Sequence, residues 1–348
     1  MGIACLVASS RSALACDERW RGPAGEIRQR WNARDGSLVA RVWSARKPWA
    51  QNEQLETDAC GAHTELSRLF GDLWAGHIVL MGEVHDNGEH HIVQAQFAKS
   101  LARREIDASP VPYAVFEQIR ADQQPALDRF ADFNARARRL GTTGDLLAFL
   151  DWDKSPWSKM ADYRPLFDAV VNARFPILPG DPPRDIIRKA AKEGIAAAVS
   201  PEERTRLGLN TPLGDAQDAA SLAEIDGSHC GMIPKAAQPN MAQAQRFRDA
   251  HMADALLKAA ELHGSAVLFA GNGHVRTDRG VPWYIRQRAP DRPVDSVMLI
   301  EVIEGQTDPE SYVPRDPDGH PATDFIIFTP PAKRDKDPCD AMKKPEPK

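Results

Sequence analysis

Cysteine is scarce in this chain, and the few cysteines are widely spaced. The 348-residue sequence holds five of them, at positions 5, 16, 60, 230 and 339, with no CxxC pair. This spacing argues against a zinc site built from thiolates and against a dense disulfide framework. In an exported protein Cys60 could pair with Cys230, although the sequence alone does not fix a partner for either residue.

The chain also lacks long apolar runs and an excess of basic residues. No run of about 18 apolar residues occurs, so no membrane-spanning helix is expected. The net charge is −5 and the isoelectric point is about 6.1, so nucleic acid is not an expected partner. With 42% hydrophobic and 27% charged residues, the composition is that of a globular protein with a sizeable core.

The first 16 residues leave two interpretations open. The stretch is weakly apolar and ends in Ala13-Leu14-Ala15 before Cys16. This pattern is typical of a small-residue cleavage site or of a lipoprotein signal with Cys16 as the lipid-carrying residue. It predicts a periplasmic protein or an outer-membrane lipoprotein, with membrane contact only through that anchor. No basic segment precedes it and Arg11 interrupts it, so a disordered N-terminus without a leader is the alternative.

The middle of the chain has the pattern of an α/β fold with a mostly parallel sheet flanked by helices, because short apolar runs alternate with helical segments. We expect an irregular extension at 17–66, one α/β domain at 67–330 with a helical cap insertion at about 120–240, and a disordered tail at 331–348. The expected strands are 77–81, 113–116, 175–178, 266–270, 296–302 and 325–328, and the expected helices are 88–105, 122–139, 144–150, 159–173, 183–199, 214–225 and 239–263.

Polar residues follow four of these strands directly. Glu83 and His85 follow the first, Glu117 the second, the sequence Pro-Gly-Asp at 179–181 the third, and His274 and Arg276 the fourth. Because ligands bind beyond the carboxyl ends of parallel strands, we expect these side chains to meet at one edge of the sheet.

These residue types suit two kinds of chemistry. Glu83, His85 and His274 can bind zinc, manganese or iron, and the same groups can activate water as an acid/base pair. The alternative is structural: the glutamate accepts hydrogen bonds from loop amides and His274 caps a helix. His90 and His91 are adjacent in the next helix, so at most one of them can face the site.

A second group of candidates lies at 226–256. His229 sits in the loop sequence "DGSHCGMIP", and Arg248 and Met252 share one face of the following helix. Arg248 can bind the carboxylate of a ligand or form a surface ion pair with Asp249. Met252 is either a core residue or a ligand, and His229 is either a ligand or simply an exposed loop residue.

Together the motifs "GEVHDN", "HCGMIP" with "QRFRDAHMA", and "AGNGHVRTDRGVP" make residues 70–305 resemble the ChaN-type haem-binding proteins. These belong to a superfamily with the TraB/TIKI metal-dependent proteases and the erythromycin esterases. The resemblance implies an α/β core with a helical insertion, export as a lipoprotein, and haem binding. In one relative a cofacial haem pair lies between two protomers with tyrosine on iron, so a homodimer is possible here. The superfamily signature covers Glu83, His85, Asn272, His274 and Arg276, and the ChaN-type helix covers Arg248, Asp249 and Met252.

Two functions remain open. The first is a haem-binding exported protein of bacterial iron acquisition, with Tyr163 as the preferred axial ligand. Its haem slot is expected among Trp152, Trp157, Met160, Tyr163 and Phe167, residues that can equally be core. The second is an esterase- or protease-type hydrolase, metal-dependent or using Glu and His directly. In the hydrolase, Glu83, His85, Glu117 and His274 bind metal or activate water, and Arg276 stabilises an oxyanion.

Overall fold

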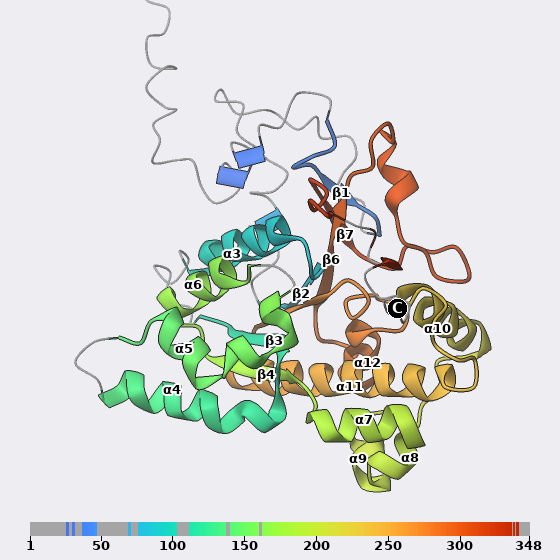
Figure 1. Ribbon diagram of the computed structural model, residues 1–348, viewed down its shortest axis with the longest axis horizontal. Coiled ribbons are helices and arrows are strands. Elements are labelled where there is room, and N and C mark those ends of the chain that lie inside the picture. The colour runs from blue at the N-terminus through green and yellow to red at the C-terminus, as the bar shows by residue number, and fades with distance from the viewer. Residues whose placement is uncertain are drawn as a thin grey trace, which may run out of the picture.

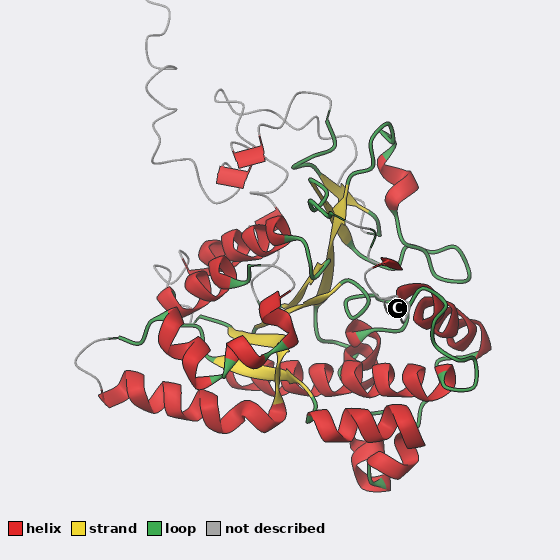
Figure 2. Ribbon diagram, viewed as in Figure 1, coloured by secondary structure: helices red, strands yellow, loops and turns green. Residues whose placement is uncertain are grey.

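A seven-stranded sheet forms the centre of the protein in a computed structural model (Figures 1 and 2). The strand order is β1-β7-β6-β2-β5-β3-β4, and only the β1–β7 pair is antiparallel. The structure describes residues 26–27, 30–31, 37–46, 69–70, 76–102, 111–136, 140–159, 162–335, 337 and 339–340.

All six expected strands are present. They are β2 (Ile78–Glu83), β3 (Tyr113–Arg120), β4 (Ile177–Asp181), β5 (Ala266–Gly271), β6 (Val294–Glu301) and β7 (Phe325–Thr329). The predicted α/β class with a mostly parallel sheet is therefore confirmed. Strand β1 (Val42–Ser44) was not expected, because its three residues lie in a segment without strand periodicity.

Both faces of the sheet are buried, which explains the continuous apolar runs. In β2, Val79 and Met81 belong to a core with α3 (Gly88–Ala102) and α6 (Arg164–Asn172). Ile78 and Leu80 point the other way, into a core with α11 (Gln238–His263) and α12 (Val281–Arg288). Successive strand residues alternate between faces, so a strand covered on both sides must be apolar at every position.

The segment expected as a helical cap contributes to both faces. Helices α4 (Gln124–Arg136), α5 (Thr143–Phe149) and α6 pack on the α3 side of the sheet. Strand β4 then adds to the edge of the sheet, and α7 (Arg184–Glu193), α8 (Ile195–Ala198) and α9 (Pro201–Arg206) follow. Residues of α7 and α8 pack in the core of the α11 side, and α10 (Asp215–Ser228) also contacts α11.

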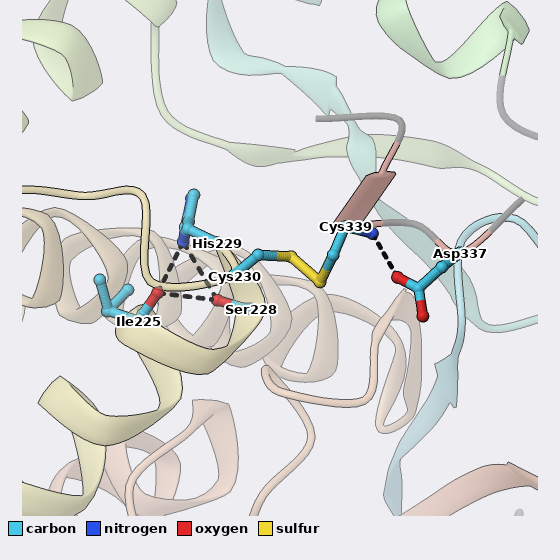
Figure 3. The surroundings of a disulfide bond; sticks show 6 residues. All are labelled: Ile225, Ser228, His229, Cys230, Asp337 and Cys339. Carbon is cyan, nitrogen blue, oxygen red and sulfur yellow. Dashed lines mark hydrogen bonds between the residues drawn. A yellow bond between two sulfur atoms is a disulfide. The ribbon is translucent and has the colours of Figure 1, made fainter. Parts of the chain in front are cut away.

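Two side chains of the C-terminal segment that the structure describes make contacts with residues far along the chain. Arg334 forms ion pairs with Asp86 at 2.6 Å and Glu301 at 2.8 Å. Cys339 forms a disulfide with Cys230, 109 residues earlier, at the end of α10 (Figure 3). The suggested pairing of Cys230 with Cys60 is therefore wrong, because Cys230 is already used. Composition did not reveal these contacts, because each depends on a single side chain.

No helix in the described part of the chain is long and apolar enough to cross a membrane. The leader residues 1–16, Cys60 and Met160 lie outside the described residues, so the expectations for them stay predictions.

Candidate functional site

The site lies at the carboxyl ends of three adjacent strands. Glu83 ends β2 and pairs in register with Gly271, which ends β5. Glu117 lies in β3, on the other side of β5, so the two carboxylates flank the end of that strand. His274 follows in the turn after β5. The expected meeting of strand-end polar groups at one edge is what the structure shows for Glu83, His85, Glu117 and His274.

Glu83 is a fully buried carboxylate surrounded by donors. Its Oε1 accepts hydrogen bonds from Tyr163 at 2.6 Å and Gln118 at 3.0 Å, and lies 2.8 Å from His85 Nδ1. Its Oε2 lies 3.5 Å from His91 Nε2. Burial alone would raise the pKa of Glu83, but its interactions with His91 and His85 outweigh burial and lower that pKa far below its usual range. Glu83 is therefore ionised.

The two adjacent histidines divide as helical geometry requires. His91 faces Glu83, whereas His90 accepts a hydrogen bond from the Val84 N–H through Nδ1 and contacts Thr329 through Nε2. Burial lowers the pKa of His90 to about 4, so its ring is neutral and its Nδ1 can accept that bond. His90 therefore orients the loop after β2, away from the site.

Glu117 is the second buried carboxylate and links the groups of the other strands. Its Oε1 accepts a hydrogen bond from Arg248 at 2.7 Å and lies 3.2 Å from His274 Nε2. Its Oε2 accepts the Gly271 N–H at 2.7 Å and lies 3.8 Å from His85 Nε2. Burial opposes ionisation, but the charges of His274, His85 and Arg248 hold the pKa of Glu117 well below its ordinary value.

His274 is held between two carboxylates. Its Nδ1 lies 2.5 Å from Asp249, and its Nε2 contacts Glu117. Burial favours the neutral ring, but the charges of Glu117 and Asp249 outweigh it and raise the pKa of His274 to about 10. Both ring nitrogens therefore carry protons and donate, so His274 is an imidazolium at neutral pH.

His85 occupies the boundary between this cluster and solvent. Its side chain is 27% exposed, and its ring lies 4.8 Å from that of Trp157. Burial would lower the pKa of His85, but Glu117 and Glu83 raise it. A Cβ on residue 271 would lie 2.7 Å from His85 Nε2, so glycine at that position lets the imidazole pack over the end of β5.

Helix α11 supplies the cation and the acid that complete the cluster. Arg248 bonds Glu117 and, at 2.6 Å, Asp181 at the end of β4, and Asp249 reaches His274. Arg248 therefore forms buried ion pairs rather than the surface pair considered from the sequence. Met252, predicted as either a core residue or a ligand, is fully buried in the core and does not line the cavity beside the cluster.

A cavity of about 600 Å³ adjoins the cluster, within the size range of small-molecule sites. Its walls come from the strand ends, the segment around Trp157, α10 and α11. Besides Glu83, His85, Glu117, Arg248, Asp249 and His274, the lining includes Trp157, Leu213, Glu224, Ile225, His229, Ala242, Gln245, Arg246, Asn272 and Arg279.

Two further predicted site residues line the cavity. Asn272 donates to the Leu299 carbonyl, and its buried Oδ1 has no hydrogen-bond partner among the described residues. His229 directly follows α10, and its Nδ1 lies 2.8 Å from the Ile225 carbonyl oxygen. The sequence left His229 as either a ligand or an exposed loop residue. In the structure its side chain is half-buried and lines the cavity.

Arg276 does not reach the cluster, contrary to its predicted role beside His274. It bonds Asp278 at 2.9 Å and donates to the Arg315 carbonyl. The prediction assumed an extended chain, in which residues two apart point the same way. Residues 272–275 instead form a turn, so His274 and Arg276 diverge.

Tyr163 does not line the cavity either, which counts against its predicted role as the iron ligand. Its side chain is buried and its ring stacks on His91, with ring centroids 3.7 Å apart. Its hydroxyl donates to Glu83, and burial together with that carboxylate raises the pKa of Tyr163 far above its ordinary value. It therefore orients Glu83. Of the expected haem-slot aromatics, Trp152 and Phe167 pack with each other near Tyr163, and only Trp157 reaches the cavity.

The predicted metal set is not compact. In the described ranges, the group of three potential ligands whose atoms lie within 4.8 Å of one another is Asp316, Asp318 and His320, far along the chain from Glu83, His85 and His274. Glu83, His85, Glu117 and His274 instead form a row of acid–imidazole contacts, in which His85 lies between the two glutamates.

Sequence reasoning missed Arg246, Arg279 and the contact of Asp249 with His274. Gln245, Arg248 and Asp249 have the i, i+3, i+4 spacing of one helix face, and this spacing could have placed them together at the strand ends. Arg279 pairs with Glu224 of α10 across the cavity wall, a contact that no local pattern encodes.

Comparison with known proteins gives the family. The chain is similar to the solved structure described as "Cofacial heme binding to ChaN of Campylobacter jejuni", with a TM-score of 0.57 and 20% identity over 76% of this chain and 92% of that one. It also matches an erythromycin esterase, EreC, in its open conformation, with a TM-score of 0.39 and 15% identity over 83% of each chain. No curated protein matches. The family described as haem-binding uptake, Tiki superfamily, ChaN, matches residues 69–285, more than half of the sequence. The chain therefore belongs to the ChaN family of haem-binding uptake proteins.

Proposed function

We propose that this protein binds haem in the 600 Å³ cavity, as an exported component of bacterial iron acquisition. The observation that supports this proposal best is the position of the cavity, which lies at the carboxyl edge of a parallel sheet and is lined by residues that all fall within the family match. Haem would supply an iron centre there, and the residues of the chain would bind and orient it.

The residues around the cavity fit the chemistry of haem. Trp157, Leu213 and Ile225 offer apolar surface for the macrocycle, and imidazoles are present for iron. Arg246 lines the cavity and donates to two neutral groups, the Tyr284 hydroxyl and the Thr211 carbonyl. Its positive charge is therefore available to a propionate.

Export is supported by the Cys230–Cys339 disulfide, because disulfides persist in oxidising compartments and are rare in the cytosol. We propose a periplasmic or outer-membrane location, with Cys16 as a lipid-carrying residue. A homodimer is proposed from the cofacial haem named for the Campylobacter jejuni relative.

The proposal is tested by titrating the purified protein with hemin and recording the absorption spectrum. A saturable shift of the Soret band is expected. Ala242→Trp places an indole in the cavity wall and should weaken binding, whereas Ala197→Trp, at an exposed position of α8, should not. No spectral change with the wild type would reject haem binding. Equal binding by the two tryptophan variants would reject this cavity as the site.

Hydrolysis is a second candidate, favoured by one observation. His85 lies at the cavity between two ionised carboxylates, Glu83 and Glu117, an arrangement that can shuttle protons to and from a bound water. Ester and peptide hydrolysis by the wild type and by His85→Gln would test it. Activity unchanged in that variant would reject the role assigned to His85. Arg276 lies outside the cavity, so it is not positioned to stabilise an oxyanion there.

A further inference from the structure

None of the four tyrosines of the chain lines the haem cavity, although all four are described. Tyr163 donates to a buried carboxylate, and the Tyr284 hydroxyl accepts from Arg246. Tyr312 donates to the Gln306 carbonyl, 2.9 Å away. Tyr113 starts β3 and lines a different cavity, beside α4. A phenolate of this chain is therefore not positioned to bind iron in this cavity.

Three imidazoles do line the cavity, and their contacts separate them. His274 uses both ring nitrogens for carboxylates, at 2.5 and 3.2 Å. His85 places Nδ1 2.8 Å from Glu83 and Nε2 3.8 Å from Glu117. His229 donates through Nδ1 to the Ile225 carbonyl, and its Nε2 forms no hydrogen bond with any described residue.

The arrangement at His229 is that of an imidazole prepared to bind a metal. A ligating histidine generally donates its second ring N–H to a carbonyl or carboxylate, which fixes the tautomer and leaves a lone pair on the other nitrogen. The Ile225 carbonyl has that role here. In the two other histidines of the cavity, carboxylates lie near both nitrogens.

The backbone beside His229 is held by a covalent restraint. Cys230 has φ = 56° and Gly231 has φ = 68°, so two consecutive residues are left-handed. A non-glycine residue persists in that region when its surroundings determine it. The Cys230–Cys339 disulfide supplies such a restraint one residue from His229, as Figure 3 shows.

The segment that carries Cys339 is anchored at its other end beside His85. Arg334 bonds both carboxylate oxygens of Asp86, at 2.6 and 2.7 Å, and also bonds Glu301. Arg334 thus contacts the loop after β2, and Cys339, five residues later, is bonded to the turn after α10. The two elements carry His85 and His229, and both of these side chains line the cavity.

This inference rests on the proposed haem binding: we propose that His229 Nε2 would bind the iron of a haem held in the cavity, and that the Cys230–Cys339 disulfide positions His229. The disulfide restrains the turn after α10, so the imidazole keeps its orientation before haem arrives. Loss of the disulfide should weaken haem binding only through its effect on the orientation of His229. The prediction differs from the tyrosine ligation expected from the family resemblance.

The ligand is tested with hemin and three proteins: the wild type, His229→Ala, and His320→Ala as a control at an exposed histidine outside the cavity. We expect His229→Ala to lose the imidazole-type absorption and electron paramagnetic resonance signature and to bind hemin at least about tenfold more weakly. Added imidazole should restore the signature, and His320→Ala should match the wild type.

The outcomes separate the two proposals. A wild type that gives no spectral change with hemin overturns haem binding, and with it the ligand. If the wild type binds hemin and His229→Ala gives the same hemin spectrum, haem binding stands and only the assignment of His229 as the iron ligand is overturned. Thermal unfolding of each variant, together with the imidazole rescue, distinguishes a lost ligand from a failure to fold.

The positioning role of the disulfide is tested by replacing both Cys230 and Cys339 with serine, once in the wild type and once in His229→Ala. Removing a contact that orients a ligand lowers metal affinity about 10- to 100-fold, and we expect a fall in this range for the wild-type background. In the His229→Ala background the serine pair should cause no further fall. Equal falls in the two backgrounds would show that the disulfide acts on the cavity generally and would overturn its role in positioning His229.

Discussion

Arg248 is the side chain whose loss should disturb the cluster most. It is 19% exposed and lies between Glu117, which is 1% exposed, and Asp181, which is 10% exposed. Arg248→Met keeps much of the apolar stem and removes the guanidinium. The variant leaves two carboxylates without their arginine, and one of them, Asp181, without any other ion pair among the described contacts.

The size of the effect follows from this geometry. Removing one partner of a buried ion pair costs about 3–5 kcal/mol, because an uncompensated charge remains. In Arg248→Met, Glu117 still contacts His274 and accepts the Gly271 N–H, so it loses only part of the stabilisation of its charge. We therefore expect a destabilisation of about 3–4 kcal/mol, or about 6–8 °C in Tm for a domain of this size.

The dependence on pH gives a sharper test. Burial raises the pKa of Asp181, and Arg248 opposes that shift, so the pKa rises further in Arg248→Met. Protonated Asp181 needs no cation, so the destabilisation should be smaller at pH 5 than at pH 7. Thermal unfolding followed by circular dichroism measures both values.

The control is Arg136→Met, which removes a solvent-exposed ion pair with Asp132. It should change stability by less than about 1 kcal/mol. An Arg248→Met destabilisation as small as that of the control, or one that grows as the pH falls, would refute the assignment of Arg248 as the cation that balances this buried cluster.

Three other substitutions test the site. His274 has its pKa raised to about 10, so its stabilisation is complete below pH 6.5 and lost as pH rises toward 10; relative to His274→Asn, the wild type should lose at most about 1.4 kcal/mol per pH unit in chemical denaturation. Gly82→Ala puts a Cβ 2.2 Å from Asn272 Oδ1 and should cost about 1–3 kcal/mol by thermal unfolding. Tyr163→Phe should cost about 1–3 kcal/mol by the same measurement, without changing the hemin spectrum.

Each of these three predictions has a result that would contradict it. A difference between wild type and His274→Asn that stays constant from pH 7 to 10 would mean that His274 is not an imidazolium. Gly88→Ala, where the Cβ meets nothing within 4 Å, is the matched control for Gly82→Ala, and equal stabilities would remove the steric argument. A Soret band lost in Tyr163→Phe would restore Tyr163 as the iron ligand.

The sheet was predictable because its signals are local. Continuous apolar runs such as that of β2 occur where a strand is buried on both faces, and all six such runs form strands. Strand-end residues were also predictable, because parallel strands bring their carboxyl ends to one edge. Glu83, Glu117 and His274 come together because β2, β3 and β5 are adjacent parallel strands.

Helical periodicity was informative but incomplete. It gave α11 nearly to its bounds, yet Arg248 and Met252 were assigned to one functional face. Met252 is in the core, whereas Arg248 points to the strand ends together with Gln245 and Asp249. Helical periodicity predicts that one face of the helix is buried. Only the packing of α11 on the sheet determines which residues lie at the margin of that buried face.

By itself, the amino-acid sequence determined the fold class, the strands and the edge of the sheet where polar groups gather, because each follows from the pattern of neighbouring residues. Tertiary structure alone decided that Tyr163 supports Glu83, that Arg276 turns away, and that Cys230 joins Cys339. These outcomes depend on contacts between residues up to 109 positions apart, whose distances and orientations are set by the packing of the whole domain.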